Sequence, residues 1–319
     1  MNSTDPTTLQ DTTNPVPRMS GNRNRWKYKN NLSAALFLLP MLGFYAVFYV
    51  YAFYFLIQTS FQDVSLSFRN AKPVGFQNYF LVLTHDLFYQ AVLNTFVFAG
   101  ILVLASLTLG FGLAVILSFR IPGRAVFFSI FMLPTLIPAS LIASVFASML
   151  EYRYGNLNEL LRTIGLGALA QRWLVDPQLA YMAVISIFVY LIGLPILYYT
   201  ADLSTIDTSV IEAAIIDGAG TIQLFRLILF PLLSNAHKTV IVTTFLSIFR
   251  AFEIVYLFTG GGPSNTTDIT GTYIYTFMRT GNNIGYVSAA SVIVLLLALV
   301  FSIIQLRLYQ RAGNKERLS

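Results

Sequence analysis

The sequence LFYQAVLNTFVFAGILVLASLTLGFGLAVILSF, residues 87–119, contains no Asp, Glu, Lys or Arg. A helix needs about 20 apolar residues to cross the hydrocarbon core of a membrane, and this stretch is long enough to do so. Because the hydrocarbon core offers no water to pair with backbone N–H and C=O groups, a crossing segment of this kind is expected to be an α-helix. The stretch therefore predicts a membrane protein.

The composition of the whole chain agrees with this prediction. Of the 319 residues, 56% are hydrophobic and 11% are charged, whereas soluble domains contain roughly 25% charged residues. The runs show no ten-residue alternating pattern of the kind that forms a β-barrel. We predict an all-α, polytopic membrane protein with six transmembrane helices. These lie near residues 32–57, 88–118, 125–149, 178–201, 239–259 and 284–306.

The distribution of basic residues predicts the orientation in the membrane. Thirteen Lys and Arg residues lie in the N-terminal tail, the 119–124 turn, the 202–238 loop and the C-terminal tail, and six lie in the opposite loops. This excess places both termini in the cytoplasm. The net charge of +6 is then a consequence of topology, and the basic residues are too scattered to predict nucleic-acid binding.

The chain divides into three predicted regions. Residues 1–30 are polar, contain Pro and have few aliphatic side chains, which is typical of a disordered tail. Residues 31–310 form the transmembrane domain, and residues 311–319 form a short cytoplasmic tail. The first apolar run is longer than the roughly 7 to 15 residues of a signal-peptide core, so we do not expect cleavage there.

Several kinds of chemistry are not expected. The chain has no Cys and two His, which excludes disulfides and thiolate metal sites. His85 and His237 are predicted on opposite sides of the membrane and cannot share a metal ion. The chain lacks the GxxxxGK[ST] pattern of a P-loop and any convergent catalytic group. We therefore predict no metal, no cofactor and no enzymatic activity on this chain.

The sequence SVIEAAIIDGAGTIQLFRLILFPLL, residues 209–233, lies in a loop predicted to face the cytoplasm. The spacing of Ser209 and Glu212 predicts a capping box that begins a short helix, and Gly218 is a typical helix stop. A second helix is expected over residues 221–230. The acidic and small residues of the first helix suit either a contact with another protein or a solvated surface, and the pattern alone leaves both interpretations open.

This loop resembles the EAA loop of the permease subunits of binding-protein-dependent ATP-binding cassette (ABC) importers. The family pattern is Glu-Ala-Ala, three residues, Gly, and later a hydrophobic residue followed by Pro. The matching residues are Glu212, Ala213, Ala214, Asp217, Gly218, Phe230 and Pro231. Other stretches resemble the carbohydrate branch of the family. They are GFQNYF at 75–80, NTFVF at 94–98, FMLPTLIP at 131–138, TGGGPSNTT at 259–267 and GYVSAASVIVLLL at 285–297.

The resemblance implies a type I ABC importer transmembrane domain in a bacterial or archaeal cell (inner) membrane. It implies four partners: a second permease subunit in a heterodimer, two cytoplasmic ATPase subunits that bind ATP and Mg, and an extracytoplasmic solute-binding protein. Residues 207–233 would form the loop that docks on the ATPase. The coupling residues by position are Glu212, Ala213, Ala214, Asp217 and Gly218. The TGGGP sequence is similar to the first permease of maltose, glycerol-3-phosphate and multiple-sugar systems, which implies a sugar, polyol or glycerol-phosphate substrate.

Two charged residues, Arg250 and Glu253, lie within the fifth predicted span. Arg250 would sit near the middle of the membrane, where a charge costs about 2.5 to 3.5 kcal/mol. Glu253 lies three residues further on and would share its helix face. The two residues could form a buried ion pair or line a translocation pathway. The alternative function is an ion-coupled secondary transporter. It is less favoured than an ABC importer, because Glu253 is the single carboxylate within the predicted spans.

Overall fold

The computed structural model describes residues 36–67, 71–119, 121–280 and 283–316, with side chains described up to residue 309. The predicted tail 1–30 lies outside the described residues. The chain divides into two units at the boundary between Phe55 and Leu56. Each unit is considered by itself.

The described part of the first unit is a helix that includes the π-helical turn η1 (Ala46–Val50). It continues as α2 (Tyr51–Ser60) into the second unit, and the run Leu36–Ser60 is long and apolar enough to cross a membrane. Aromatic side chains four residues apart stack along it, with a ring-centroid distance of 4.8 Å between Tyr45 and Tyr49. The helix agrees with the first predicted span.

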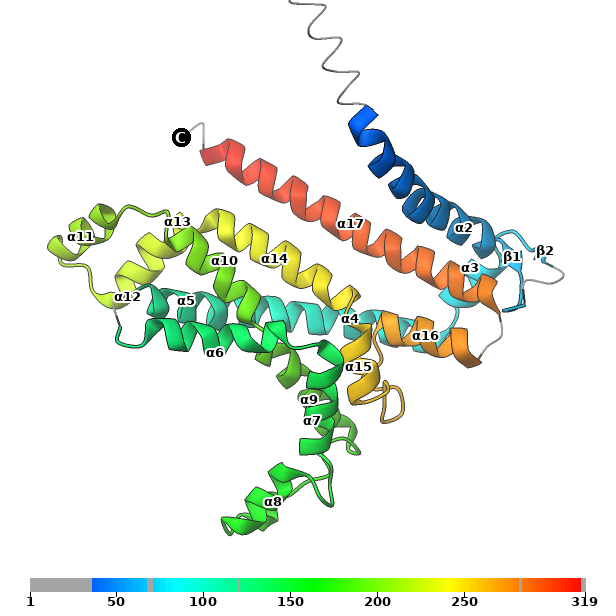
Figure 1. Ribbon diagram of the computed structural model, residues 1–319, viewed down its shortest axis with the longest axis horizontal. Helices are drawn as coiled ribbons and strands as arrows, with labels where there is room; N and C mark the ends of the chain where they lie inside the picture. The colour runs from blue at the N-terminus through cyan, green and yellow to red at the C-terminus, as the bar shows by residue number, and fades with distance from the viewer. Residues whose placement is uncertain (1–35, 68–70, 120, 281–282, 317–319) are drawn as a thin grey trace, which may run out of the picture. The chain divides into compact units, whose positions relative to one another are not determined.

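Among the described residues of the second unit, the regular secondary structure is helical apart from a two-stranded antiparallel hairpin (Figure 1). In the hairpin, β1 (Gln62–Asp63) pairs with β2 (Lys72–Pro73), with Gln62 opposite Pro73. The helices of its first half are α3 (Gln77–Leu83), α4 (Asp86–Ala105), η2 (Ser106–Gly110), α5 (Phe111–Ser118), α6 (Arg124–Leu136), α7 (Ala139–Met149), α8 (Asn156–Thr163), η3 (Gly167–Leu169) and α9 (Pro177–Tyr190). Those of its second half are α10 (Gly193–Leu203), α11 (Thr208–Ile216), α12 (Thr221–Gln223), η4 (Leu224–Leu229), α13 (Phe230–Leu232), α14 (Ser234–Phe249), α15 (Phe252–Phe258), α16 (Thr270–Thr280) and α17 (Ile284–Glu316).

The prediction of an all-α, polytopic fold is confirmed. Among the described residues, four helices are long and apolar enough to cross a membrane: Leu36–Ser60, Asp86–Ser118, Pro177–Leu203 and Ile284–Tyr309. The number reaches six when each of two bent helix pairs counts as one span. Helix α17 extends to Glu316, so most of the predicted C-terminal tail continues this helix.

The third predicted span is not one straight helix. It consists of α6 and α7, which meet at an angle of 98°. Ile137 between them has extended backbone, with φ −83° and ψ 137°, as expected for a residue that precedes a proline. Pro138 then supplies the N-cap of α7 and lacks the N–H that a continuous helix would need.

The boundaries predicted for the fifth span are also wrong. The predicted run 239–259 is interrupted after α14, at Arg250 and Ala251, and α15 packs against α7 rather than continuing along α14. The apolar bent pair is instead Thr221–Leu232 with α14, at an angle of 73°. The second helix of the predicted loop therefore belongs to the bundle.

Small buried residues allow the helices to approach closely. Ala99, Ala114, Ala143 and Ala183 belong to the main cluster of buried side chains, which joins α4, α5, α7, α9, α10, α14 and α15. Small residues at contacts are typical of helices that associate within a membrane, because lipid provides little hydrophobic drive for association. Gly193 makes the closest of these approaches, since a Cβ there would lie 2.5 Å from the Phe131 carbonyl oxygen of α6.

Two asparagines from the quoted motifs hold loops of the second unit in place. The side-chain amide of Asn78 donates to the carbonyl oxygens of Ser60 and Gln62, both at 2.9 Å. The amide of Asn94 donates to the carbonyl oxygens of Thr266 at 2.9 Å and Asp268 at 2.8 Å. These asparagines therefore fix the hairpin and the TGGGPSNTT loop.

The two bonds of Asn94 give a test of this arrangement. Replacing Asn94 with Asp would turn a double donor into a carboxylate that faces two carbonyl oxygens. We expect the free energy of unfolding to fall by about 1 to 3 kcal/mol, as for a buried group left without a partner. Thermal unfolding of the purified protein in detergent would measure this. The control Asn156→Asp, exposed at the start of α8, should unfold as the wild type does, and equal melting of both variants would contradict the assignment.

Candidate functional site

Helix α11 carries most of the predicted coupling residues, and Asp207 begins it. The Asp207 carboxylate accepts the backbone N–H of Ser209 at 3.0 Å, and hydrogen bonds from Ser209 lower the pKa of this carboxyl below its usual value. The predicted capping box of Ser209 and Glu212 is therefore wrong. Asp is a preferred N-cap residue, and its position two residues before Ser209 lets the helix begin earlier.

The predicted stop at Gly218 is confirmed. Gly218 has a φ of +85°, a left-handed conformation that glycine adopts without the strain of a Cβ. The Gly218 N–H bonds to the Ile215 carbonyl oxygen at 3.0 Å, and the Ala219 N–H bonds to the Ala214 carbonyl oxygen at 2.9 Å. These two bonds form a Schellman motif, which satisfies carbonyl groups at the end of the helix. A Cβ at residue 218 would meet no atom within 4 Å, so space within this chain does not require the glycine.

The predicted coupling residues divide into exposed and buried members. Glu212, Ala213, Asp217 and Gly218 are exposed. Ala214 is 8% exposed and packs into the main buried cluster of its own chain. The expectation that both alanines present a small surface to a partner is therefore wrong for Ala214, because the short helix must bury one face against its own bundle.

Two isoleucines near the glycine corner were not predicted as site residues. Ile216 is 84% exposed and Ile222 is 80% exposed, on either side of Gly218. Large apolar side chains that project beside acidic groups mark a surface suited to a protein partner. The sequence does show an apolar pair, Ile215 and Ile216, directly before Asp217. Helical periodicity alone would assign this pair to a buried face, so it did not indicate an exposed contact.

The second helix of the loop forms over the predicted range and continues two residues further, to Leu232. The Gly220 N–H donates to the Gln223 side chain at 2.9 Å at its start, and its middle turn, η4, is π-helical. Pro231 lies inside α13 and does not mark the bend, which follows at Leu233.

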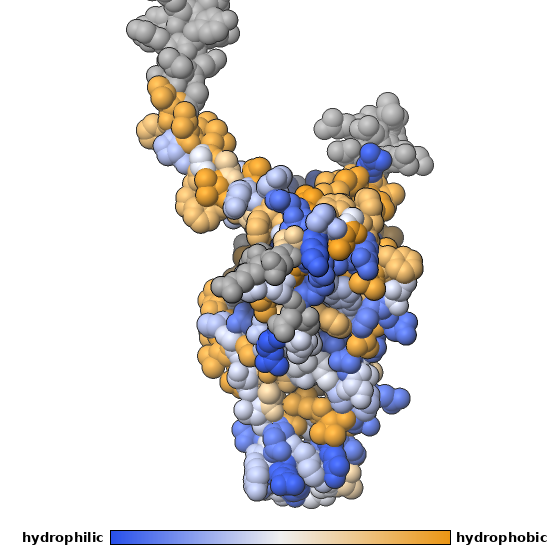
Figure 2. All heavy atoms as spheres, turned by 90° about the vertical axis from the view of Figure 1, so that its right-hand side faces the viewer, coloured by the Kyte–Doolittle hydropathy of each residue, from blue (hydrophilic) through white to orange (hydrophobic). Residues whose placement is uncertain are grey.

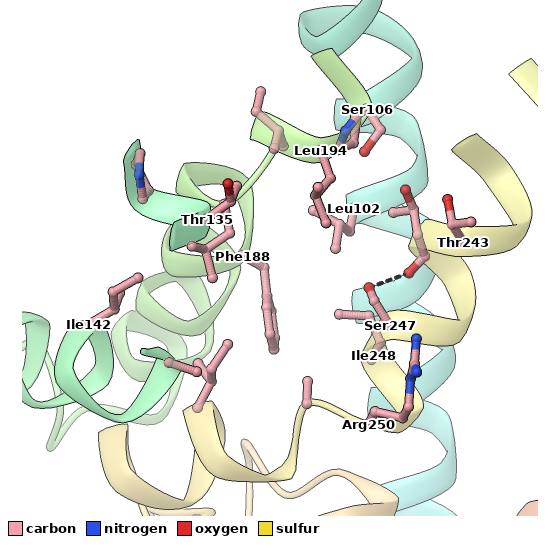
Figure 3. Close-up of a pocket in the computed structure, with 18 of the residues that line it drawn as sticks. Leu102, Ser106, Thr135, Ile142, Phe188, Leu194, Thr243, Ser247, Ile248 and Arg250 are labelled. Atoms are coloured by element: carbon pink, nitrogen blue, oxygen red, sulfur yellow. Dashed lines mark hydrogen bonds between the residues drawn. The ribbon is translucent and has the colours of Figure 1, made fainter. Parts of the chain in front are cut away.

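A cavity of about 420 Å³ lies between α4 and η2, α6 and α7, α9 and α10, and α14 and α15 (Figure 3). The labelled side chains in Figure 3 show Thr135 and Phe188 on one wall and Ser247 and Ile248 on the other. Its polar lining consists mainly of hydroxyl groups. These belong to Ser106, Thr135, Tyr198, Thr243, Thr244 and Ser247.

Arg250 and Glu253 both line this cavity, and both are exposed. They do not form an ion pair with each other, which was one of the two interpretations that the sequence left open. In the described part of the chain, the one ion pair within 4.0 Å joins Arg162 and Glu159. The physical reason is the helix break, because residues three apart share a face only in a continuous helix. Arg250 is the C-cap that follows α14, whereas Glu253 lies in the first turn of α15.

Ser106 is a cavity residue that the sequence did not indicate. It begins the π-helical turn η2 and is fully buried, and its hydroxyl has no hydrogen-bond partner within the described chain. Turns of this type inside α-helices occur frequently at functional sites. The uninterrupted apolar run 87–119 gave no sign of the irregular turn.

A polar segment between α7 and α9 forms a further exposed surface. Residues of this segment, labelled by α8 in Figure 1, form the mostly hydrophilic lower end in Figure 2. The buried side chain of Asn158 holds it together, since the amide donates to Tyr152 and Gln171 carbonyl oxygens at 3.1 and 2.9 Å and the Trp173 indole donates to its oxygen at 2.8 Å. The loop thus has a defined fold.

Comparison with known proteins shows similarity over most of the chain. Residues 106–314 match the sequence profile of a family described as binding-protein-dependent transport system inner membrane component. The sulfoquinovosyl glycerol transport system permease protein SmoG of Agrobacterium fabrum is 30% identical over 88% of this chain and 91% of its own length. The trehalose/maltose transport system permease protein MalF of Thermococcus litoralis is 29% identical over 89% of this chain and 96% of its own.

A solved structure has the same fold. A chain in the crystal structure of a bacterial ABC transporter involved in the import of the acidic polysaccharide alginate superposes with a TM-score of 0.78. The match covers 90% of this chain and 98% of that chain, at 23% sequence identity.

The cap of α11 gives a testable prediction. Replacing Asp207 with Ala should loosen the first turn, because the Ser209 N–H loses its acceptor, whereas Asn should preserve the cap. Hydrogen–deuterium exchange of peptides that cover α11 would show faster exchange for Asp207→Ala alone. Folding lowers the pKa of the Asp207 carboxyl, so its contribution to the stability of α11 is fully present above the ordinary carboxyl pKa. This contribution is lost as pH falls through the lowered pKa. Asp207→Asn should remove this acid sensitivity. Equal exchange in both variants at neutral pH would refute the cap.

Proposed function

The chain belongs to the family of binding-protein-dependent transport system inner membrane components, and we propose that it forms half of the translocation pathway of a sugar importer driven by ATP hydrolysis on separate subunits. It is a multi-pass membrane permease, and permeases of this family are not themselves enzymes. ATP and Mg would bind to the partner ATPase, and this chain would hold no cofactor. The protein would lie in the cell (inner) membrane of a bacterium or archaeon, and both termini would face the cytoplasm.

The geometry of α11 carries the proposal. The helix is capped at both ends and presents Glu212, Ala213, Asp217 and Gly218 at a sharp corner. Exposed Ile216 and the acidic groups together suit a groove with an apolar floor and a basic rim. Two cytoplasmic ATPase subunits, one for each permease, would supply such grooves.

Movement of the ATPase would reach the cavity through the bundle. The loop that contains α11 continues through α12, η4 and α13 into α14, and α14 forms one wall of the cavity. Closure of the ATPase pair around ATP would move this loop, and the wall with it, so that the cavity opens toward the extracytoplasmic side. The ATP-bound ATPase pair would thus favour one of two conformations of the permease.

The lining of the cavity favours a polyhydroxylated solute. Six hydroxyl-bearing side chains line a space of about 420 Å³, together with apolar walls. Such groups both donate and accept hydrogen bonds, as sugar hydroxyls do. The relatives named for sulfoquinovosyl glycerol and for trehalose and maltose support a sugar, polyol or glycerol phosphate as the substrate class.

The other partners follow from the same assignment. A second, different permease would complete the pathway, because the TGGGP stretch at 259–263 is similar to one of the two permeases of sugar systems. An extracytoplasmic solute-binding protein would deliver the sugar. The ordered polar segment around α8 is a suitable surface for that protein, since it is hydrophilic and rigidly held by Asn158.

Arg250 and Glu253 would act as pathway residues. Both reach the cavity, and neither is paired with another charge in the described chain. Unpaired charged groups beside a translocation route are available to bond substrate hydroxyls. This assignment replaces the ion-pair interpretation. It also disfavours the alternative of an ion-coupled transporter, because Glu253 is the one carboxylate among the residues that line the cavity.

Coupling can be tested at Gly218. The permease would be reconstituted in vesicles with its second permease, ATPase and binding protein, using a labelled mono- or disaccharide selected because it raises the melting temperature of that binding protein. Gly218→Asp should reduce uptake by about tenfold while membrane insertion is retained, because a carboxylate would crowd the docked corner. Gly218→Asn has the same size and also tolerates the left-handed conformation, so it should reduce uptake to the same extent if crowding is the cause. Uptake by Gly218→Asp at the wild-type rate would refute docking at this corner.

A second test concerns the charged cavity residues. Arg250→Gln and Glu253→Gln should each lower uptake by about tenfold, as for the loss of one hydrogen bond to a charged group, without changing ATPase activity in the absence of binding protein. Asp86→Asn, exposed at the start of α4, controls for removal of a carboxylate elsewhere. Wild-type uptake by both cavity variants would exclude them from the pathway.

A further inference from the structure

His237 is buried in the first turn of α14 and has no role in the function described above. It is 9% exposed, and three aromatic rings surround it. The ring-centroid distances are 5.7 Å to Phe111 of α5, 5.3 Å to Tyr199 of α10 and 4.2 Å to Phe230 of α13. An imidazole enclosed by side chains from three other helices is placed to connect them.

Both ring nitrogens of His237 are hydrogen-bonded. Nε2 lies 2.9 Å from the carbonyl oxygen of Phe230, and Nδ1 lies 2.7 Å from the hydroxyl of Tyr199. A carbonyl oxygen only accepts, so Nε2 carries the hydrogen, and Nδ1 of the neutral ring then accepts from the Tyr199 hydroxyl. The chain of bonds runs in one direction, from the Tyr199 hydroxyl through the imidazole to the Phe230 carbonyl.

The Phe230 carbonyl belongs to the last turn of the helical segment 221–232, where carbonyl groups lack partners within the helix. The chain bends by 73° directly after this turn, before α14 begins. His237 lies on the far side of the bend. Its bond to Phe230 therefore ties together the two helices that meet there.

Tyr199 extends the connection to a wall of the cavity. It is fully buried in α10, and the same helix contributes Leu194, Pro195 and Tyr198 to the cavity lining. The helix that carries His237 contributes Thr243 and Ser247 to the same lining. The imidazole thus connects the end of the coupling segment, residues 207–233, with two of the helices that line the cavity.

We propose that His237 and Tyr199 are positioning residues that transmit the movement of the coupling segment to α10, and so to the cavity. This inference rests on the proposed function, because it assumes that an ATPase moves the segment. With the bonds in place, the segment, α14 and α10 move together. Without them, the bend after α13 absorbs the movement, and ATP is hydrolysed without a matching change at the cavity.

The test measures sugar uptake and ATP hydrolysis in the same reconstituted vesicles, using the labelled sugar that stabilises the cognate binding protein. Tyr199→Phe removes only the hydroxyl, and His237→Phe keeps a ring but removes both bonds. Each should lower the sugar molecules transported per ATP hydrolysed by about fivefold or more, the scale of a typical coupling free energy. The double variant should be no worse than His237→Phe alone, because both changes break one connected pathway.

The matched control is Tyr273→Phe, because Tyr273 is also buried and its hydroxyl lies 3.3 Å from the other histidine, His85. This pair lies far from the coupling segment, on α16 and beside α4. Tyr273→Phe should lower the melting temperature as Tyr199→Phe does but leave the ratio of sugar to ATP unchanged.

Two results would overturn the proposal. An unchanged ratio in Tyr199→Phe shows that the bond is only structural, and an equal fall in Tyr273→Phe shows a general effect of lost stability. If His237→Phe does not fold, the Tyr199→Phe measurement decides alone. A wild-type complex with no ATP-dependent uptake would instead refute the proposed function, which separates that failure from failure of the connection.

Discussion

A helix that breaks within an apolar layer leaves backbone N–H and C=O groups without partners, and no water is available there to satisfy them. Three breaks govern this structure: between α6 and α7, between α13 and α14, and between α14 and α15. A polar side chain close to each break donates to a carbonyl of the turn before it. The pairs are Thr135 with Met132 at 2.7 Å, His237 with Phe230 at 2.9 Å, and Ser247 with Thr244 at 2.6 Å.

The same constraint explains the location of the cavity. Irregular backbone at membrane depth is tolerated where it lines a cavity or is buried in protein. The α6–α7 and α14–α15 breaks both border the cavity, and Thr135 and Ser247 therefore serve the backbone and the lining together. Ser106 differs from them, because its hydroxyl has no partner in the described chain and remains available. Part of the polar lining of the cavity thus results from where the helices stop.

The sequence predicted the parts of the fold that depend on composition and local conformation. Long uncharged runs such as 87–119 gave the spans, and Gly218 gave the end of α11 because the stop requires a positive φ. The two helix breaks near the cavity were not predicted, since hydropathy averaged over a span does not register a bend. Pro138 hinted at the first break, whereas no proline or glycine marks the second, at Arg250 and Ala251.

Other misses depended on contacts between residues far apart in the sequence. Ala214 faces its own bundle, where it belongs to the same buried cluster as Leu224 and Leu229 of the following helix. The pairing of Arg250 with Glu253 was inferred from helical periodicity, which fails when the helix ends between them. His237 was predicted to lie in the 202–238 loop, and its two partners lie 38 and 7 residues away. Local patterns cannot reveal such partners.

The distribution of stiffness along the chain determines where movement can occur. The corner at Gly218 is closed by two backbone bonds, and the bend after α13 is braced by His237. No side-chain hydrogen bond in the described chain crosses the break between α14 and α15. Under the proposed function, displacement that enters at α11 would therefore be carried past the first two corners and reach the third. Because Arg250 and Glu253 lie on opposite sides of that break, any rotation there changes their separation, and with it the charge distribution that the cavity presents to a solute.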